Sequence, residues 1–269
     1  MGDPIGPPEF WAAAIIDFEK NLSRTIWFGA SEALSNLTIR QLAHIRIPIG
    51  FQTVLDPVDW EGIKSNNGPM RYQIGRSARK NIKIRAARPS DFPEIHRCLV
   101  KWQASKSPFK LYFMTDPDIA LHPDHRTVWL AEQNGQLQGY LIASPIPKKK
   151  GWLLEQWVRK PTAPNGVIEQ LVDHAITQLG HDGARYITMG LCPLTPSPEL
   201  SLSIAERGQF TLGRLATSWF YKSYSLTRFK LKFGFPIHEP IYASFSHLRT
   251  LPLSCVDTVL AFMVRPSTM

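Results

Sequence analysis

The sequence contains little cysteine and no long apolar segment. Its three cysteines, Cys98, Cys192 and Cys255, lie far apart in 269 residues, which argues against a disulfide framework or a zinc ribbon and is typical of a reducing cytosol. No uninterrupted apolar run approaches the roughly 20 residues that span a bilayer. The first ten residues lack the basic and apolar regions of a secretory signal. We therefore expect a protein that is soluble or attached only to a membrane surface.

Acidic residues are outnumbered by basic ones. The 31 Lys and Arg against 22 Asp and Glu give a formal charge of +9. This excess fits a polyanionic partner, either nucleic acid or an anionic membrane surface, and it equally fits an ordinary basic protein. With 43% hydrophobic residues, the chain has enough apolar material for one large domain or two of ordinary size.

Hydrophobic periodicity predicts both helices and strands. The predicted helices cover residues 10–42 (with Ser31 as a cap), 56–66, 68–80, 91–105 (capped by Ser90 or Asp91) and 166–179. The predicted strands cover residues 45–55, 82–87, 127–133, 136–147, 151–161 and 185–194. Asn134-Gly135 is the favoured pair for a tight hairpin between two of these strands.

The order of the later elements indicates an α+β fold. Two hairpin strands, a third strand, a loop, a helix and a strand follow one another, which is a layered α+β pattern. It is also the order of the acyltransferase fold of the N-acetyltransferase (GNAT) type, in which mixed central sheets are flanked by helices. In that fold the loop before the main helix cradles a phosphate-bearing donor.

The loop "RKPTAPNGV" opens directly onto the predicted helix at 166–179. Unpaired backbone N–H groups and the helix dipole favour an anion at such a position, so Asn165 and Gly166 are candidate substrate-binding residues. A plain tight turn at this pair is the alternative. An acetyl-CoA enzyme has Gln/Arg-x-x-Gly-x-Gly/Ala here, and "APNGV" lacks that glycine spacing. We therefore consider a CoA pyrophosphate the less favoured anion.

Three stretches together carry a family resemblance. They are "LLEQWVRKPTAPNGVIEQLVDHAITQLGHDGARYITMGLCPL", "RFKLKFGFPIHEPIYASF" and, more weakly, "RYQIGRSARKNIKIR". The combination resembles the C-terminal catalytic domain of bacterial aminoacyl-phosphatidylglycerol synthases, the phosphatidylglycerol lysyltransferase family. That resemblance implies two tandem acyltransferase folds, which we expect at residues 1–125 (degenerate) and 126–269 (catalytic).

The resemblance also implies an activity and its partners. The family moves an aminoacyl group from aminoacyl-tRNA to the hydroxyl of a lipid headgroup such as phosphatidylglycerol. The expected partners are thus aminoacyl-tRNA and an anionic phospholipid or membrane surface, with no cofactor or metal, in the cytoplasm or at the inner face of the membrane. Two alternatives stay open: an acyl-CoA-dependent N-acyltransferase, and a non-catalytic module that binds tRNA or a membrane.

The strand before the loop carries the first catalytic candidates. Alternation along a strand would place Glu155, Trp157 and Arg159 on one face. There a carboxylate and a guanidinium could orient the donor's α-amino group and a phosphate, or simply form a cross-strand salt bridge. The family has Asp at the position of Glu155 and a basic residue at the position of Val158, so the donated amino acid stays open.

The second matching stretch contains two lysines. Lys230 and Lys232 alternate with apolar residues, so in a strand both would face one way and offer two ammonium groups to phosphate. The resemblance implies that one of them is essential without indicating which. Arg228 is a further substrate-binding candidate. Glu239 would pair with a substrate amine or with one of the lysines.

A basic helix supplies candidate phosphate contacts. Its four cations would bind the phosphates of tRNA or of an anionic lipid without reading a base sequence, or would form an ordinary solvated face. They are Arg71, Arg76, Arg79 and Lys80.

Other polar and aromatic groups are weaker candidates. A loop contains His122, His125, Asp116, Asp118 and Asp124, but lacks a further ligand at metal-site spacing. Trp157, Trp219, Phe220 and Tyr221 would line a lipid-facing groove or form core. His174 is expected to be a partly buried surface residue, and Cys192 a small buried hydrophobe.

Overall fold

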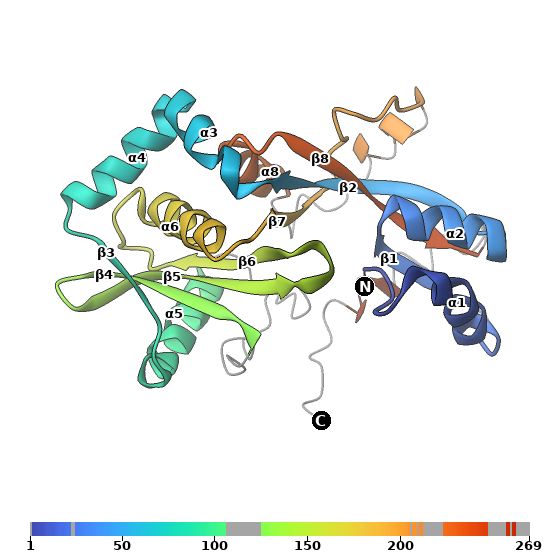
Figure 1. Cartoon of the computed structure of the whole chain (residues 1–269), viewed down its shortest axis with the longest axis horizontal. Coiled ribbons are helices and arrows are strands. Elements are labelled where there is room, and N and C mark those ends of the chain that lie inside the picture. The colour runs from blue at the N-terminus through green and yellow to red at the C-terminus, as the bar shows by residue number, and fades with distance from the viewer. Residues whose placement is uncertain are drawn as a thin grey trace. The chain divides into compact units, whose positions relative to one another are not determined.

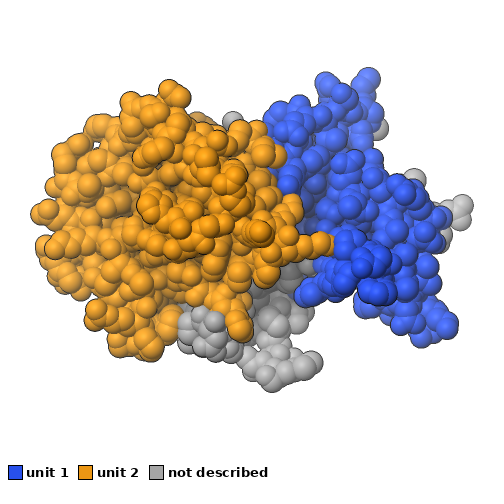
Figure 2. Space-filling model, in the orientation of Figure 1, with its two compact units in different colours: residues 1–52, 191–227, 238–269 blue, residues 53–190, 228–237 orange. Residues whose placement is uncertain are grey.

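The computed structural model describes residues 2–22, 25–105, 125–204, 206–208, 210–211, 223–246, 257–258 and 260–261. Its helices and strands (Figure 1) divide between two compact units. Unit 1 comprises residues 1–52, 191–227 and 238–269, and unit 2 comprises residues 53–190 and 228–237 (Figure 2). The two units are therefore interleaved along the chain.

Unit 2 is built on a mainly antiparallel group of strands. These are β3 (Lys83–Ala86), β4 (Thr127–Gln133), β5 (Gln136–Ile146), β6 (Gly151–Arg159) and the first part of β7 (Tyr186–Pro193). Only the pairing of β6 with β7 is parallel among the unit 2 pairs. The β4–β5 hairpin turns at Asn134 and Gly135, with φ of 52° and 74°. Positive φ at both positions is what a tight hairpin turn requires, so this prediction is confirmed.

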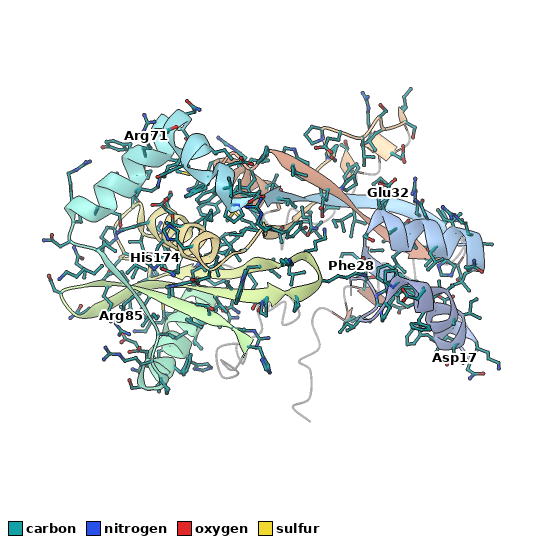
Figure 3. The ribbon with its side chains drawn as sticks, viewed as in Figure 1. Asp17, Phe28, Glu32, Arg71, Arg85 and His174 are labelled. Atoms are coloured by element: carbon teal, nitrogen blue, oxygen red, sulfur yellow. The ribbon has the colours of Figure 1, made fainter. Side chains whose placement is uncertain are left out.

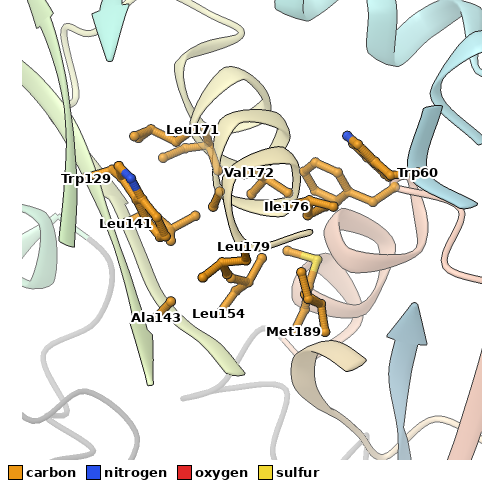
Figure 4. Close-up of a cluster of buried hydrophobic side chains, with 14 of the residues drawn as sticks. Trp60, Trp129, Leu141, Ala143, Leu154, Leu171, Val172, Ile176, Leu179 and Met189 are labelled. Atoms are coloured by element: carbon orange, nitrogen blue, oxygen red, sulfur yellow. The ribbon is translucent and has the colours of Figure 1, made fainter. Parts of the chain in front are cut away.

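Helices cover both faces of these strands. α6 (Val167–His181) covers one face, and α5 (Phe92–Ala104) covers the other (Figure 1). Figure 4 shows the α6 side, where Leu171 faces Trp129 and Leu141 of the strands and Ile176 points toward Trp60. The connecting helices α3 (Trp60–Asn66) and α4 (Gly68–Arg79) add to the α6 side. Burial of this apolar layer fixes where β6 ends and α6 begins.

The strands that remain lie mainly in unit 1, together with the first two helices of the chain. They are β1 (Ile26–Ala30), β8 (Ile237–Phe245), β2 (Ile45–Leu55), α1 (Trp11–Glu19) and α2 (Glu32–Leu42), and α8 (Ser223–Leu231) passes from unit 1 into unit 2. Short 3-10 turns lie at Pro8–Phe10, Pro57–Asp59, Pro89–Asp91 and Pro147–Lys149. Ser31 caps α2 as predicted, because its Oγ accepts a hydrogen bond from the Leu34 N–H at 3.2 Å.

The predicted α+β class is confirmed. The strands follow the order β1-β8-β2-β7-β6-β5-β4-β3 in one mixed, mostly antiparallel sheet. The boundary expected between residues 125 and 126 lies within unit 2, and the assignment of two tandem folds to residues 1–125 and 126–269 stays a prediction. In the described ranges, no helix has the length and apolar character needed to cross a bilayer.

One local prediction is wrong, and another is confirmed only in part. The helix expected over residues 10–42 is divided by β1, whose β-branched and aromatic residues favour a strand. Asp91 is the N-cap residue of α5, one of the two positions expected, but its side chain makes no capping hydrogen bond. It instead accepts hydrogen bonds from the Arg88 N–H and the Arg85 guanidinium.

Candidate active site

The predicted substrate loop ends at Gly166, the N-cap of α6. Its φ is 96°, and a Cβ there would lie 2.1 Å from the Gln73 carbonyl oxygen of α4. The glycine therefore allows α4 and α6 to pack closely, whereas the sequence suggested that it lets an anion approach. The neighbouring Asn165 is exposed. A role for Asn165 and Gly166 in substrate binding stays a prediction.

β6 and β7 pair over a short stretch. The parallel register joins Gly151 to Tyr186 and ends at Leu153 and Thr188, although β6 continues to Arg159. The second half of β6 thus extends beyond the paired stretch. Phe229 and Lys230 of α8 lie near Trp157 in this half, and Lys232 follows the helix.

An aromatic stack joins β6 to α8. The rings of Trp157 and Phe229 lie 4.9 Å apart with an angle of 19° between their planes. The Lys232 Nζ lies 3.9 Å from the Phe229 ring centroid and 2.5 Å from the Glu169 carboxylate. We refer to Trp157, Glu169, Phe229, Lys230 and Lys232 as the α8 cluster. A lysine over an aromatic face and beside a carboxylate has its ammonium group in a defined position.

Lys230 is the buried member of the α8 cluster. Lys230 is only 4% exposed, and its Nζ lies 5.9 Å from the Trp157 ring centroid. The position that a Cβ on Gly190 would take is 3.9 Å from the same Nζ. A buried ammonium group is costly unless neighbouring groups compensate its charge, and such groups are often functional.

The prediction that the two lysines lie in a strand is wrong. Lys230 belongs to α8, and Lys232 follows its last residue. Residues two apart on a helix point in different directions, which gives Lys230 and Lys232 different surroundings. The apolar residues that suggested alternation include Phe229 of α8 and Phe233, which follows the helix; their rings lie 5.4 Å apart.

Glu155 lies on a β-bulge of β6. The register with β5 passes from Ile142–Gln156 to Ala143–Leu154, so Glu155 is the extra residue. Trp157 packs on the α6 side, whereas the Glu155 carboxylate accepts hydrogen bonds from Ser144 and from the Arg126 Nε, the latter at 3.3 Å.

The bulge overturns one expectation for Glu155, and a second is met only in part. Glu155 does not share a face with Trp157 and Arg159, because an extra residue shifts the alternation by one position. Glu155 does form a salt bridge, but its partner Arg126 lies just before β4 and not in a strand. Sequence reasoning missed Arg126 and Ser144, since their contacts follow from a register that the sequence does not display.

The remaining candidates of the loop and the second stretch are dispersed. The Arg159 Nη1 donates a hydrogen bond to the Ala163 carbonyl at 3.0 Å and so closes the loop on itself. Arg228 is exposed on α8. In unit 1, the Glu239 carboxylate accepts a hydrogen bond from the Gln52 Nε2 at 2.7 Å. Their predicted roles in catalysis and substrate binding stay predictions.

The basic helix is α4, as expected from the sequence. Arg71, Arg79 and Lys80 are exposed and Arg76 is half-buried; Figure 3 shows Arg71 pointing away from the body of unit 2. Arg79 also lies over the Tyr72 ring, at 6.0 Å.

Arg85, by contrast, is occupied by an ion-pair network. Its guanidinium binds Asp91 and Glu132 at 2.6 Å each. The hydrogen bond from Arg85 lowers the pKa of Asp91 to about 2, and the two carboxylates raise the pKa of Arg85. Arg85 is therefore a structural cation, whereas the α4 cations point outward.

Two further groups behave as expected. His174 is half-buried and meets the Trp129 ring edge-on at 6.1 Å. Burial lowers the pKa of His174, although the adjacent Asp173 opposes the shift. Cys192 is fully buried.

Several candidates fall outside the structure. Most of the His and Asp loop, namely Asp116, Asp118, His122 and Asp124, and the aromatic residues Trp219, Phe220 and Tyr221 lie outside the described residues. Within the described ones, no group of three or more His, Cys, Asp or Glu could hold a metal ion.

Two residues around Lys232 were also missed. Glu169 lies in the first turn of α6 and pairs with the Lys232 ammonium, and the Asn67 Nδ2 donates to the Lys232 carbonyl at 2.7 Å. An acidic residue in the first turn usually indicates only a favourable interaction with the helix dipole. Nothing in the sequence connects it to a lysine 63 positions later.

Comparisons with known proteins place this arrangement in a family. The model described as "Phosphatidylglycerol lysyltransferase, C-terminal" matches residues 1–245. The lysylphosphatidylglycerol biosynthesis bifunctional protein LysX of Rhodococcus jostii is 27% identical over 205 residues, covering 70% of this chain and 18% of the relative. LysX of Mycolicibacterium gilvum is 24% identical over 283 residues, covering 98% of this chain and 25% of the relative. The chain thus spans about a quarter or less of the length of these curated relatives.

Solved structures share the fold. The C-terminal domain of a lysylphosphatidylglycerol synthetase from Agrobacterium fabrum superposes with a TM-score of 0.77 at 18% identity, covering 100% of this chain and 83% of that chain. L-PGS from Bacillus licheniformis gives a TM-score of 0.76 at 15% identity, covering 97% of this chain and 81% of that chain. Because the family model covers nearly the whole chain, the protein belongs to the phosphatidylglycerol lysyltransferase C-terminal family.

Proposed function

We propose that the protein transfers an aminoacyl group from aminoacyl-tRNA to a hydroxyl of the phosphatidylglycerol headgroup. The observation that carries the proposal is the α8 cluster, in which one buried lysine and one carboxylate-paired lysine lie with Trp157 of β6 and Phe229 of α8. Membership of the phosphatidylglycerol lysyltransferase family makes this lipid the first acceptor to test. Lysine is the first donor to test for the same reason.

The reaction requires few groups, because the tRNA ester is already activated. The lipid hydroxyl oxygen attacks the ester carbonyl carbon, the bond to the tRNA ribose breaks, and the ribose oxygen takes a proton. Negative charge develops on the carbonyl oxygen during this step. An ammonium group held in a partly dry site stabilises that charge most effectively, and Lys230 fits this role best because it is buried.

The other cluster members would position the reactants. Glu169 holds Lys232 in place through their ion pair, and Lys232 would bind a phosphate of the donor or the lipid. Glu155, held by Arg126 and Ser144, would bind the α-amino group of the aminoacyl donor. The outward-pointing α4 cations would bind the tRNA backbone.

The two substrates of the proposed reaction also indicate where in the cell it would take place. Charged tRNA is a cytoplasmic donor and the acceptor is a membrane lipid. We therefore propose that the reaction takes place at the inner face of the membrane.

The test is an incubation of radiolabelled aminoacyl-tRNAs with phosphatidylglycerol vesicles, followed by lipid extraction. We expect label in the lipid phase, lowered by about 100-fold or more in Lys230→Ala, with smaller losses in Lys232→Ala and Glu155→Gln. Lys83→Ala, at an exposed lysine of β3, is the matched control and should retain full activity.

Two outcomes would contradict the proposal. Label that persists in Lys230→Ala would remove the α8 cluster from catalysis. No lipid label with any amino acid, despite tRNA binding, would remove the lipid acceptor and leave a non-catalytic binding module. Transfer from acyl-CoA to an amine would then be the next reaction to assay.

A further inference from the structure

α1 exposes a line of apolar side chains. Phe10, Ala14 and Phe18 are spaced by four residues, so they lie along one side of the helix, and Leu22 follows in the turn after it. Phe10 is 64% exposed, Phe18 58% and Leu22 49%, and Ala14 is exposed as well. We refer to these four residues as the α1 stripe.

Most of the α1 stripe lies outside the face that attaches the helix to unit 1, although the Phe18 ring also contacts the Trp27 ring of β1, with centroids 5.5 Å apart. Trp11 and Ile15, 8% and 0% exposed, form that face and pack with Ala30 and Leu34. Single exposed apolar residues are ordinary on soluble proteins, but a contiguous line of large ones usually marks an interaction site. Packing within unit 1 therefore does not account for the part of the stripe that stays exposed.

We propose that the α1 stripe inserts into the surface of the bilayer that holds the lipid acceptor. This inference rests on the proposed function, because an enzyme acting on a bilayer lipid must keep its site at the bilayer surface. Helices with Phe and Leu on an exposed side insert that side at the boundary between headgroups and acyl chains. The two phenylalanines supply most of the exposed area of the stripe.

The size of the stripe argues against a second copy of the chain as its occupant. Its four side chains offer roughly 400 Å² of exposed apolar surface, since an aromatic side chain contributes at most about 150–250 Å². A stable dimer buries about 800 Å² on each partner. A bilayer has no such minimum, because insertion strength simply increases with the apolar area inserted.

The charges on α1 indicate how the stripe would bind. Glu9 and Asp17 are exposed on the same segment, and Figure 3 shows Asp17 pointing into solvent. These carboxylates repel anionic headgroups, and only Lys20 opposes them among the exposed charges of α1. Attachment through the stripe is therefore apolar and persists at high salt. Adsorption through basic side chains would instead be screened.

The test is flotation of the protein with phosphatidylglycerol/phosphatidylcholine vesicles at low salt and at about 1 M salt. We expect the Phe10→Ser/Phe18→Ser double variant to lose at least about tenfold of its salt-resistant binding. The matched control is Val58→Ser/Ile204→Ser, which removes two side chains that are 68% and 91% exposed elsewhere. Circular dichroism and thermal unfolding check that both variants fold.

Two results of the flotation would overturn the inference. Equal salt-resistant binding by the stripe variant and the wild type would remove the stripe from membrane attachment. A wild-type dimer that the stripe substitutions convert to a monomer would assign the surface to a second copy.

A second assay separates this inference from the proposed function. Short-chain phosphatidylglycerol, dispersed below its micelle concentration, presents the headgroup without a bilayer. We expect the stripe variant to aminoacylate this dispersed lipid normally and to fail only on vesicles. If the wild type modifies neither form while its salt-resistant flotation still depends on the stripe, the docking surface stands and the proposed reaction is wrong. If the stripe variant loses activity equally on both forms, the stripe acts on the reaction itself and the docking inference is wrong.

Discussion

At the scale of single residues, a partly buried histidine couples the fold to pH. The pKa of His174 is lowered because burial disfavours its charged form. Its ring contacts Trp129 in the layer between α6 and the strands.

His174 makes the stability of the protein decrease in mild acid. In the unfolded chain its pKa is about 6.5, and in the folded chain it is lower, so between these values the unfolded state binds more protons. The contribution of His174 is thus fully present above about pH 6.5 and is lost as the pH falls below it. His174→Phe, which keeps a ring against Trp129, should flatten this dependence in denaturant titrations from pH 5 to 8. Equal slopes in the variant and the wild type would contradict the assignment.

At the scale of elements, the junction between β6 and α6 depends on close packing. Gly166 has positive φ and lies against the α4 backbone, so two separate effects exclude a side chain at this position. The loop before it is closed by Arg159. The start of α6, and with it Glu169, is therefore fixed relative to α4.

Gly166→Ala should destabilise the protein by about 3 kcal/mol, from about 1 kcal/mol of left-handed strain and about 2 kcal/mol of overpacking. Gly183→Ala is a matched control, because its φ is 86° but nothing lies within 4 Å of the added Cβ. Gly183→Ala should therefore lower the free energy of unfolding only by the contribution of left-handed strain. Urea unfolding measures both, and equal losses would show that α4 yields to the new methyl group.

Sequence reasoning succeeded where local patterns determine an element. The bounds of β2 coincide with its alternating pattern, and Asn134-Gly135 forms the expected turn. It failed where a long-range contact decides the outcome. The bulge at Glu155 changes the direction in which the side chains of β6 face. Alternation predicted a strand around Phe229, but this residue lies on a helix and stacks on Trp157. The direction in which a candidate side chain faces therefore could not be predicted from local alternation alone.

At the scale of the whole molecule, the formal charge of +9 favours association with polyanions. Charge alone does not identify which part of the surface binds. The α4 cations are exposed on one helix, and Lys148, Lys149 and Lys150 are exposed at the turn between β5 and β6. Substitutions in these two groups remove the same charge from different places, so they distinguish an effect of net charge from an effect of where the charge lies.

The logarithm of the tRNA binding constant should fall linearly with the logarithm of the salt concentration. Replacing Arg71, Arg79 and Lys80 with Gln should reduce that slope by about 2–3, since each lost phosphate contact removes about one. The matched control replaces Lys148, Lys149 and Lys150 with Gln and removes the same formal charge. Filter binding over a salt series measures both, and an equal change in the two triple variants would assign the effect to net charge alone.

The interleaving of the two units has a consequence for synthesis on the ribosome. Phe233 and Phe235 belong to the buried core of unit 2, but residues 191–227, which belong to unit 1, are translated before them. The core around α6 therefore stays incomplete until most of the chain has emerged. During that interval the nascent chain exposes the apolar side of α6, so chaperones that bind apolar segments have a defined period in which to act.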